Sequence, residues 1–600
     1  MTNNKDLWIA AIARGHNSSV CLLKNGEIVF SIEEERLTRQ KYDGGPLAAM
    51  LKIKEYTDTI DYLVIAHTQS LNETAGRIDF TGDDIYTGLA RKLGLISRHE
   101  NLLQHPQVID LSHIHHKLHA ACAFYRSGFT KAAALVVDGA GTFIPLSIGN
   151  ETVISWETES IFDCSYPAMF KTVYKHLGLR GPNPGTLMTE LSSEMYNESE
   201  DSTHTALITD HAGIVKVYEA VTEYCGWQSI EAGKTMGLFP YGQSNSNIPE
   251  LFDTTSIVPL SNRNLIIPTY PNGAVVNKGL YAELNDVEFE SDVSTLNNRR
   301  DLAYACQHET QEQVLNLIRK AVNETGHNQV VISGGYGLNC VANYYYLDKL
   351  KDENIEIYVE PISNDAGTAI GAAMLIYKDL VPESNIDYSK DGLYLGIEYI
   401  YTEEYLNSIA TDYDAIITDT TYNDIVELLL AKNIIALFQG KSENGPRALG
   451  NRSILFNPSY EDGKDYVNTV KHREYFRPFA GTILEEHVHD WFDLRGIDSS
   501  PHMMYAVNCK DGVAEKIPSI IHIDGTCRIQ TVTTNQNKHF YNLIKTFYDK
   551  TNIPILFNTS FNLGGEPLVE TLEDALSTLK NSEIEYLYLP ELNKLVYIKN

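Results

Sequence analysis

The chain has 600 residues, of which 43% are hydrophobic and 21% are charged, and its net charge is −31. These values are typical of a soluble globular protein long enough for several domains. An acidic chain without a Lys/Arg run repels long nucleic acid, so DNA and RNA are disfavoured partners.

The eight cysteines are scattered and form no C-x-x-C pair. This pattern predicts neither a disulfide framework nor a zinc ribbon, and it favours a reducing, cytoplasmic location. The first apolar run breaks at Arg14-Gly15-His16, unlike a signal peptide. No stretch reaches the roughly 18 apolar residues of a membrane span, so we expect no membrane partner.

A β-loop-β-turn-β pattern occurs at the start of the chain and returns about 120 residues later. In the first copy the expected strands are Leu7–Ala13, Ser19–Lys24 and Glu27–Ile32, with a hairpin turn at Asn25-Gly26. In the second copy they are Ala132–Val137, Phe143–Ile148 and Thr152–Glu157, with a turn at Gly149-Asn150. The repeat indicates a duplicated α/β unit.

Several predicted strands end in loops rich in glycine, where backbone amides can approach a phosphate. These loops contain Gly139 and Gly141 after the second-copy strand, and Gly334, Gly335 and Asn339 after Gln329–Ile332. A further loop ending at Gly367 opens an Ala/Gly-rich helix, Thr368–Tyr377, whose small residues predict close packing and whose start is a candidate anion site. For each loop alone an ordinary turn is the better explanation, whereas the repeat of the pattern makes chance a weaker one.

The domain organisation follows from changes in regularity along the chain. Residues from about 181 to 300 are less regular and are interpreted as an insertion shaping a substrate pocket. The polar stretch VPESNIDYSK, residues 381–390, is the predicted domain boundary. Beyond it, Ile434–Phe438 and Ile553–Phe557 are expected strands, each entering a polar loop.

The sequence HHKLH contains a candidate metal site. His115 and His119 are four residues apart and therefore share one helix face. Asp138 and Asp365 follow predicted strands beside glycine, where exposed carboxylates could complete a ligand set. A polar helix start with solvated histidines is an equally good interpretation of the spacing.

Three segments of the C-terminal third combine cations with glycine, proline or aromatic residues. Arginine forks and open backbone in such segments match phosphate oxygens. The segments are Gly440–Ser453, Lys471–Phe479 and His522–Thr531. Taken together, the three segments favour a nucleotide or another polyphosphate as ligand. Any single segment alone would be explained by a solvated charged face.

Long motifs of the chain resemble the NodU/CmcH-type O-carbamoyltransferases. The N-terminal motifs are GHNSS, EEERLTRQKYD, HHKLHA, VVDGAG, KTMGLFPYG, SGGYGLNCVAN and NDAGTAIGAA. The C-terminal motifs are GPRALGNRSIL, KHREYFRPFAG, HIDGTCRIQTV and NTSFNLGGEPLVETLEDAL. The resemblance extends over essentially the whole chain in the order of the family.

The resemblance implies an α/β protein of two domains. Residues 1–380 would form a TsaD-like domain of the actin/sugar-kinase fold, and residues 390–600 a YrdC-like domain. In such enzymes the second domain converts ATP and carbamoyl phosphate into carbamoyl adenylate and pyrophosphate. The first domain then transfers the carbamoyl group to an acceptor hydroxyl.

The resemblance also implies roles for residues of the first domain. His115, His119, Asp138 and Asp365 would bind one divalent metal, Fe²⁺ or similar, and the Gly-rich loops would bind the nucleotide. His16 would be the general base for the acceptor hydroxyl, and Lys41 would stabilise developing negative charge.

In the second domain the resemblance implies a pocket for carbamoyl phosphate and ATP with Mg²⁺. Its residues would be Arg447, Arg452, Lys471, Arg473, Arg477, Arg528, Asn558, Ser560 and Asn562. Two positions depart from the family pattern: Asn17 replaces an aspartate, and Gly564 replaces a residue that is often basic.

The acceptor stays open, because fold and donor chemistry do not determine it. A sugar, a natural product or a hydroxymethylated pyrimidine, free or in DNA, carries a suitable hydroxyl, and a small molecule is favoured. The alternatives are a threonylcarbamoyl-type tRNA modification enzyme and a non-catalytic nucleotide-binding regulator. A homodimer is one option for the assembly.

Overall fold

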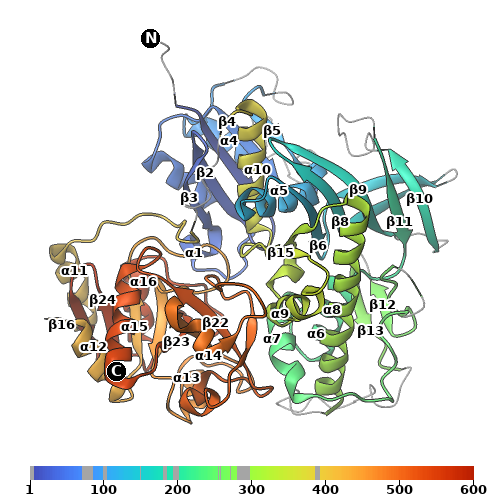
Figure 1. Ribbon diagram of the computed structural model, residues 1–600. Helices are drawn as coiled ribbons and strands as arrows, with labels where there is room; N and C mark the ends of the chain where they lie inside the picture. The colour runs from blue at the N-terminus through green and yellow to red at the C-terminus, as the bar shows by residue number, and fades with distance from the viewer. Residues whose placement is uncertain are drawn as a thin grey trace. The chain divides into compact units, whose positions relative to one another are not determined.

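The computed structural model describes residues 6–69, 85–98, 105–148, 151–179, 185–192, 202–253, 256, 258–269, 272–279, 297–384 and 392–599 (Figure 1). The chain divides into two compact units. The first consists of Met1–Val29 and Gly44–Tyr388, and the second of Phe30–Asp43 and Ser389–Asn600. The second unit therefore contains an N-terminal segment that the sequence analysis placed in the first domain.

The first sheet of the first unit has the strand order β3-β2-β1-β4-β5. Its strands are β1 (Trp8–Ala13), β2 (Ser19–Lys24), β3 (Glu27–Glu33), β4 (Tyr62–Ala66) and β5 (Val108–Asp110). Strand β2 is antiparallel to β1, whereas β4 is parallel to β1 and β5 to β4. The predicted hairpin turn is confirmed, since Asn25 and Gly26 have φ of 51° and 90°.

The second sheet repeats this order as β9-β8-β6-β14-β15. Its strands are β6 (Lys131–Val137), β8 (Glu151–Ser165), β9 (Met169–Leu179), β14 (Gln329–Ser333) and β15 (Glu356–Val359). The pairings also repeat, because β8 is antiparallel to β6, and β14 is parallel to both β6 and β15. The duplicated architecture expected of an actin/sugar-kinase-like unit is confirmed.

The strands expected in the second copy are observed, and the last two form a hairpin, but they do not all correspond to those of the first copy. Strand β7 (Phe143–Ile148) pairs with the first part of β8, whereas β6 pairs with the second part, from Glu159 onward. The counterparts of β2 and β3 are therefore the second part of β8 and strand β9. The local pattern of a hairpin could not reveal this, because strand partners are chosen by long-range pairing. The predicted turn at Gly149-Asn150 lies outside the described residues.

Two central helices, α5 (His115–Ser127) and α10 (Ala366–Leu380), pack against each other between the sheets of this unit (Figure 1). Helix α10 contacts β1, β2 and β4, whereas α5 contacts β6, β8 and β14. A β-carbon at Gly371 of α10 would lie 2.0 Å from the backbone oxygen of Leu118. The prediction that the small residues of this helix permit close packing is confirmed.

The range 181–300 contains regular elements among its described residues. Strands β10 (Thr186–Ser192) and β11 (Thr203–Thr209) extend the second sheet beside β9. The other elements of the first unit are α2 (Leu47–Lys52), α4 (Ile85–Lys92), α6 (Ile214–Tyr224), α7 (Ala232–Leu238), β12 (Ile266–Thr269), β13 (Gly273–Val276), α8 (Asn297–Thr325) and α9 (Cys340–Leu350). The stretch thus begins by extending the sheet and continues with helices.

The second unit is built on a mixed sheet of order β16-β25-β24-β17-β18-β23-β19-β22-β21-β20. The strands are β16 (Ile416–Asp419), β17 (Ile435–Phe438), β18 (Arg452–Phe456), β19 (Ala480–Leu484), β20 (Phe492–Asp493), β21 (Ala506–Cys509), β22 (Thr526–Val532), β23 (Ile555–Ser560), β24 (Tyr586–Leu589) and β25 (Lys594–Tyr597). The helices are α1 (Glu34–Thr38), α11 (Glu403–Ala410), α12 (Tyr422–Leu430), α13 (Gly463–Val470), α14 (Val488–Trp491), α15 (Lys538–Thr551) and α16 (Leu572–Lys580). Its main apolar core lies between this sheet and helices α12 and α15. The α/β class expected for this unit is confirmed.

All eight cysteines are free thiols, as the scattered spacing predicts. Among the helices of the described residues, none combines the length and apolarity needed to cross a bilayer.

We predict that Gly371→Ala destabilises the first unit. The added methyl group would meet a backbone oxygen that cannot move independently of α5, and overpacking of this kind costs about 1–3 kcal/mol. The measurement is the urea midpoint of unfolding. Gly233→Ala is the matched control, because this helical glycine has no heavy atom within 4 Å of an added β-carbon. Equal midpoints for the two variants would contradict the close crossing.

Candidate functional site

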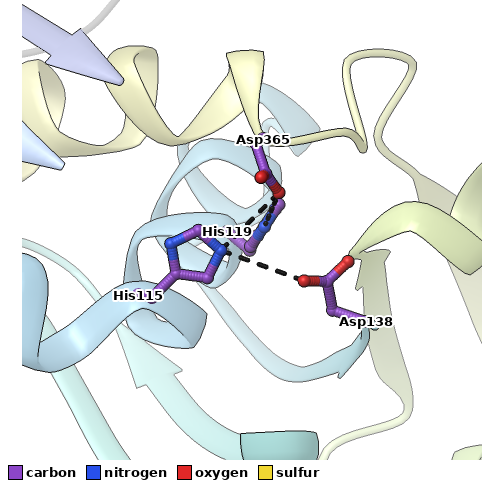
Figure 2. Close-up of side chains that lie close together, drawn as sticks. All are labelled: His115, His119, Asp138 and Asp365. Atoms are coloured by element: carbon purple, nitrogen blue, oxygen red, sulfur yellow. Dashed lines mark ion pairs between the residues drawn. The ribbon is translucent and has the colours of Figure 1, made fainter. Parts of the chain in front are cut away.

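Four side chains from three separate segments converge in the first unit (Figure 2). His115 and His119 lie on the first turns of α5, Asp138 follows β6, and Asp365 directly precedes α10. One ligand atom from each lies within 4.8 Å of all the others. The Nε2 atoms of both histidines are 3.6 Å from Oδ1 of Asp365, and that of His115 is 3.9 Å from Oδ2 of Asp138. The predicted grouping of these four residues is therefore observed.

The histidine nitrogens that face the cluster lack hydrogen bonds. Both Nε2 atoms are buried without a partner, and His115 and His119 are 2% and 0% exposed. The backbone N–H of Gly335 donates to Oδ1 of Asp138 at 2.9 Å, which orients that carboxylate. Two imidazoles and two carboxylates gathered in this way form a donor set suited to a divalent metal.

The charges of the cluster depend on one another. Burial alone would raise the pKa of Asp365, yet its interactions with His115 and His119 and the nearby His16 hold the pKa well below its usual range. Burial would lower the pKa of His115, but the carboxylates of Asp365 and Asp138 outweigh it and raise the pKa. The cluster therefore favours a cation between its carboxylates, which a bound metal ion would supply.

His16 lies beside the cluster, on the loop between β1 and β2. Its Nδ1 is 3.8 Å from Oδ2 of Asp365, and its side chain is 50% exposed. Gly15 permits this approach, since it has φ of 115° and donates its N–H to the backbone oxygen of Gly44 at 3.3 Å. An exposed imidazole next to a metal cluster is accessible to an external hydroxyl, as its predicted role requires.

His67 was not predicted and lies close enough to the cluster to sense its charges. It follows β4, the strand parallel to β1. Burial, Arg14 and His115 lower the pKa of His67 to about 3, so its imidazole is neutral at physiological pH. The sequence signal was a histidine at the end of the apolar run YLVIA, the same position that Asp138 has after β6.

The Gly-rich loops of the first unit have packing roles that the sequence did not reveal. A β-carbon at Gly334 would lie 2.4 Å from the backbone oxygen of Val137, and one at Gly141 would lie 2.4 Å from the ring of His116. Gly139 is close to Glu219, and Gly335 binds Asp138. Asn339 caps α9 through Ala342 and pairs with Gln307. Nucleotide binding by these five residues stays a prediction.

A cluster of cations forms in the second unit. Lys471, Arg473 and Arg477 lie between α13 and β19, and Arg528 lies on β22, where it is the register partner of Ala480. Burial and the charges of Arg473 and Arg477 lower the pKa of Lys471 well below its usual range. The pKa of Arg473 is lowered similarly by burial, Arg477 and Arg528. Cations that destabilise one another in this way are suited to bind an anion.

Polar side chains of the strand end at β23 border this cluster. The ammonium of Lys471 donates to the backbone oxygen of Ser560 and, at 3.1 Å, to Oδ1 of Asn562. Arg473 lies 3.5 Å from Oγ1 of Thr559 and stacks over Phe479. Arg477 is 3.6 Å from Glu474. The structure therefore brings six predicted residues together: Lys471, Arg473, Arg477, Arg528, Ser560 and Asn562.

Two residues predicted to bind the ligand are engaged by the protein instead. Arg452 is fully buried, and its guanidinium donates to backbone oxygens of Gln439, Asn451 and Glu570. Asn558 is fully buried and donates to Ala448, Thr482 and Gln530. Since their donors are used internally, both side chains hold the loop around half-buried Arg447, and their assignment as ligand contacts stays a prediction.

Lys41 belongs to the second unit rather than to the first. Its Nζ is 2.7 Å from Oε1 of Glu35, whose other oxygen accepts the N–H of Tyr42 at 2.9 Å. The expectation that placed Lys41 in the first domain is corrected, because the sequence gives no sign that residues 30–43 pack with the distant C-terminal half.

Gly564 departs from the family pattern for a steric reason in this chain. Its N–H donates to the backbone oxygen of Lys471 at 2.8 Å, and an added β-carbon would lie 2.6 Å from the oxygen of His472. A side chain at this position would displace the segment that begins the cation cluster.

The first unit thus has a duplicated α/β fold with a candidate metal site, and the second unit has a cluster of cations. Two family models match the chain: "Carbamoyltransferase N-terminus" at residues 69–374 and "Carbamoyltransferase C-terminus" at residues 426–595. The first alone covers more than half of the chain. The chain belongs to the NodU/CmcH-type carbamoyltransferase family, as its motifs predict.

Named relatives agree with this assignment. The nodulation protein NolNO of Sinorhizobium fredii is 28% identical over 95% of this chain and 78% of its own length. The 3'-hydroxymethylcephem-O-carbamoyltransferase of Streptomyces clavuligerus is 27% identical over 59% of this chain and 63% of its own length. The crystal structure of HypF in its phosphate- and nucleotide-bound form covers 64% of this chain and 57% of that chain, with 14% identity and a TM-score of 0.35. A structural likeness of this size supports no inference.

We predict that His119→Gln weakens divalent metal binding by more than about 100-fold. Loss of a group that only hydrogen-bonds to a metal ligand typically costs about 10–100-fold, and loss of the ligand itself should cost more. The substitution removes one of the four donors that come together among the described residues. The measurement is Co²⁺ affinity by titration of the visible absorption bands. His113→Gln is the matched control, because His113 lies six residues earlier and outside the cluster. Unchanged affinity in the His119 variant would contradict the site.

Proposed function

We propose that this chain is an ATP- and carbamoyl-phosphate-dependent O-carbamoyltransferase that works in two half-reactions. Family membership supports carbamoyl transfer. The observation that supports the first half-reaction is the cluster of Lys471, Arg473, Arg477 and Arg528, whose mutual repulsion a phosphate-bearing ligand would relieve. ATP with Mg²⁺ and carbamoyl phosphate are the ligands that we assign to it.

The first half-reaction is proposed to form carbamoyl adenylate. Atom balance requires that water first cleaves carbamoyl phosphate into carbamate and phosphate. A carbamate oxygen then attacks the α-phosphorus of ATP and displaces pyrophosphate. The cations would stabilise the charge that accumulates on the phosphate oxygens, while Ser560 and Asn562 would orient the ligand through their polar groups.

The second half-reaction is proposed to take place in the first unit. The acceptor oxygen attacks the carbamoyl carbon, the bond to the adenylate oxygen breaks, and AMP leaves. His16 would accept the hydroxyl proton at its exposed imidazole. His115, His119, Asp138 and Asp365 would hold a divalent metal, Fe²⁺ or a similar ion, which would supply positive charge for the phosphate of the nucleotide.

The proposed acceptor is a hydroxyl on a small molecule. A sugar, a natural product or a hydroxymethylated pyrimidine fits this chemistry, and one relative is named for a hydroxymethyl group on a cephem. The net charge of −31 weighs against tRNA or another long nucleic acid as acceptor.

The first half-reaction can be tested without an acceptor. We expect ATP to release pyrophosphate only when carbamoyl phosphate is present, with one phosphate released per pyrophosphate. Arg528→Ala should lower this rate about 100-fold or more, because preorganised charge of this kind contributes at least that much. Lys545→Ala is the control, since Lys545 lies on α15, where it pairs with Asp549 and lies over the ring of Tyr548. Release without carbamoyl phosphate, or an unaffected Arg528 variant, would refute the assigned site.

His16→Ala should separate the two half-reactions. We expect the release of pyrophosphate to persist, whereas transfer to a hydroxyl acceptor should fall about 10²–10⁴-fold with loss of a general base. The measurement combines the pyrophosphate assay with mass spectrometry of a panel of acceptors: an aminoglycoside, a hydroxymethylcephem and 5-hydroxymethylcytidine. Loss of both activities would remove the assignment of His16 as the base.

A further inference from the structure

Residues 30–43, here named the strap, are an N-terminal segment that forms part of the second unit. The strap contains the end of β3 and helix α1. Three of its acidic and basic side chains, Glu33, Glu35 and Arg36, are between 4% and 5% exposed, which is unusual for charged groups. Buried charged groups require hydrogen-bond or ion-pair partners, and the partners of these side chains indicate the role of the strap.

Side chains of the strap hold one loop of the C-terminal half. The guanidinium of Arg36 donates to the backbone oxygens of Glu443 at 3.2 Å and Gly445 at 2.8 Å. Glu33 accepts the N–H of Gly445 at 3.2 Å. Asn444, between them, donates to Oγ of Ser31 at 2.6 Å. Three consecutive residues are thus held, two positions before Arg447.

The same loop is closed internally by the side chain of Glu443. Its Oε1 accepts the N–H groups of Leu449 at 2.7 Å and Asn451 at 2.8 Å. Arg36 fixes the backbone of the residue from which this carboxylate extends. The strap therefore determines the position of both ends of the segment that carries Arg447.

A second strap residue holds the chain that follows the polar end of β23. Arg39 donates to the backbone oxygens of Pro567 at 3.0 Å and Leu568 at 2.5 Å. Its backbone has φ of 61°, which turns the strap so that this side chain and Arg36 reach different segments. Asn562 contacts the same turn, because its Nδ2 donates to the backbone oxygen of Glu566 at 2.6 Å.

We propose that the strap is an integral part of the anion site of the second unit, with Arg36 and Glu33 as positioning residues for the loop that carries Arg447. The site is then not contained in residues 389–600. The strap also brings Lys41, whose Nζ is 2.7 Å from Oε1 of Glu35, into this unit. The identity of the anion rests on the proposed function, whereas the role of the strap rests on its contacts alone.

Arginine is required at position 36 for a geometric reason. Its two Nη atoms reach two carbonyl oxygens that belong to residues two positions apart. An ammonium group keeps the charge but does not reproduce the planar fork. Arg36→Lys should therefore loosen the loop while leaving the charge of the unit unchanged.

The test uses the full-length protein and inorganic phosphate as the probe. Arg36→Lys should weaken phosphate binding about tenfold or more, because small displacements of binding groups have effects of this size. Amide hydrogen exchange at Gly445, Leu449 and Asn451 should become faster, while Co²⁺ binding to the metal cluster stays unchanged. Arg319→Lys is the matched control, since Arg319 makes an exposed two-pronged contact with Glu353.

Glu33→Gln provides a second variant that keeps the shape of the side chain, and its amide oxygen can still accept from Gly445. It should change phosphate affinity less than Arg36→Lys does. In the pyrophosphate assay Arg36→Lys should raise the KM for carbamoyl phosphate more than it lowers kcat. Unchanged phosphate affinity and exchange in the Arg36 variant would overturn the inference. Absence of pyrophosphate release in the unaltered protein would instead refute the proposed function, since phosphate binding and exchange report on the strap independently.

Discussion

The close crossing of helices α5 and α10 is the constraint on which the first unit depends. The backbone oxygen of Leu118 on α5 lies so close to Gly371 on α10 that there is no room for a β-carbon at this position. The crossing aligns the N-terminal ends of both helices. His115 and His119 at one end meet Asp365 at the other, and each helix lies on its own sheet. The candidate metal site is therefore a consequence of the duplicated fold, because the equivalent helices of two related halves bring three of its four residues to one point.

The surrounding framework fixes these ligands with buried charges that are fully engaged. Glu157 accepts the N–H of Thr142 at 2.9 Å and pairs with Lys175, while Oγ1 of Thr142 accepts the N–H of His115 at 3.0 Å. The loop after Asp138 is thus tied to the start of α5. The carboxylate of Glu157 is held with a pKa far below its usual range, because the charges of Lys175 and His116 outweigh its burial. Such a network is rigid because each partner is needed by another.

The charged surroundings of buried polar groups distinguish framework from candidate site in both units. Arg452 and Lys471 both donate to oxygens of the protein, but the carboxylates of Glu570 and Glu443 lie near Arg452, whereas the cations Arg473 and Arg477 lie near Lys471 and lower its pKa. In the first unit, Nε2 of His119 makes no hydrogen bond and faces the carboxylate of Asp365 at 3.6 Å. Sequence motifs contain both kinds of residue side by side, and only the geometry separates those that hold the protein from those left to hold a ligand.

Local patterns predicted what local physics determines. The Asn25-Gly26 turn, the pairing of His115 with His119 on one helix face and the glycine at the helix crossing follow from backbone preferences and periodicity. The motif resemblance predicted that Asp138 and Asp365 join the histidines. The exchange of strand partners around β8, the internal engagement of Arg452 and the position of the strap could not be predicted, because each depends on contacts between segments far apart in the sequence.

The electrostatic contrast between the two units gives a physical reason for dividing the reaction. In the first unit two carboxylates face unpartnered imidazoles, an environment that attracts a cation. In the second unit cations gather in an otherwise acidic chain, an environment that attracts phosphate. The proposed ATP-dependent activation would need positive charge for the phosphate oxygens of the nucleotide, and the cations of the second unit offer it. The proposed transfer would instead use the exposed imidazole of His16 beside the carboxylate of Asp365. The two clusters therefore suit different halves of the proposed reaction.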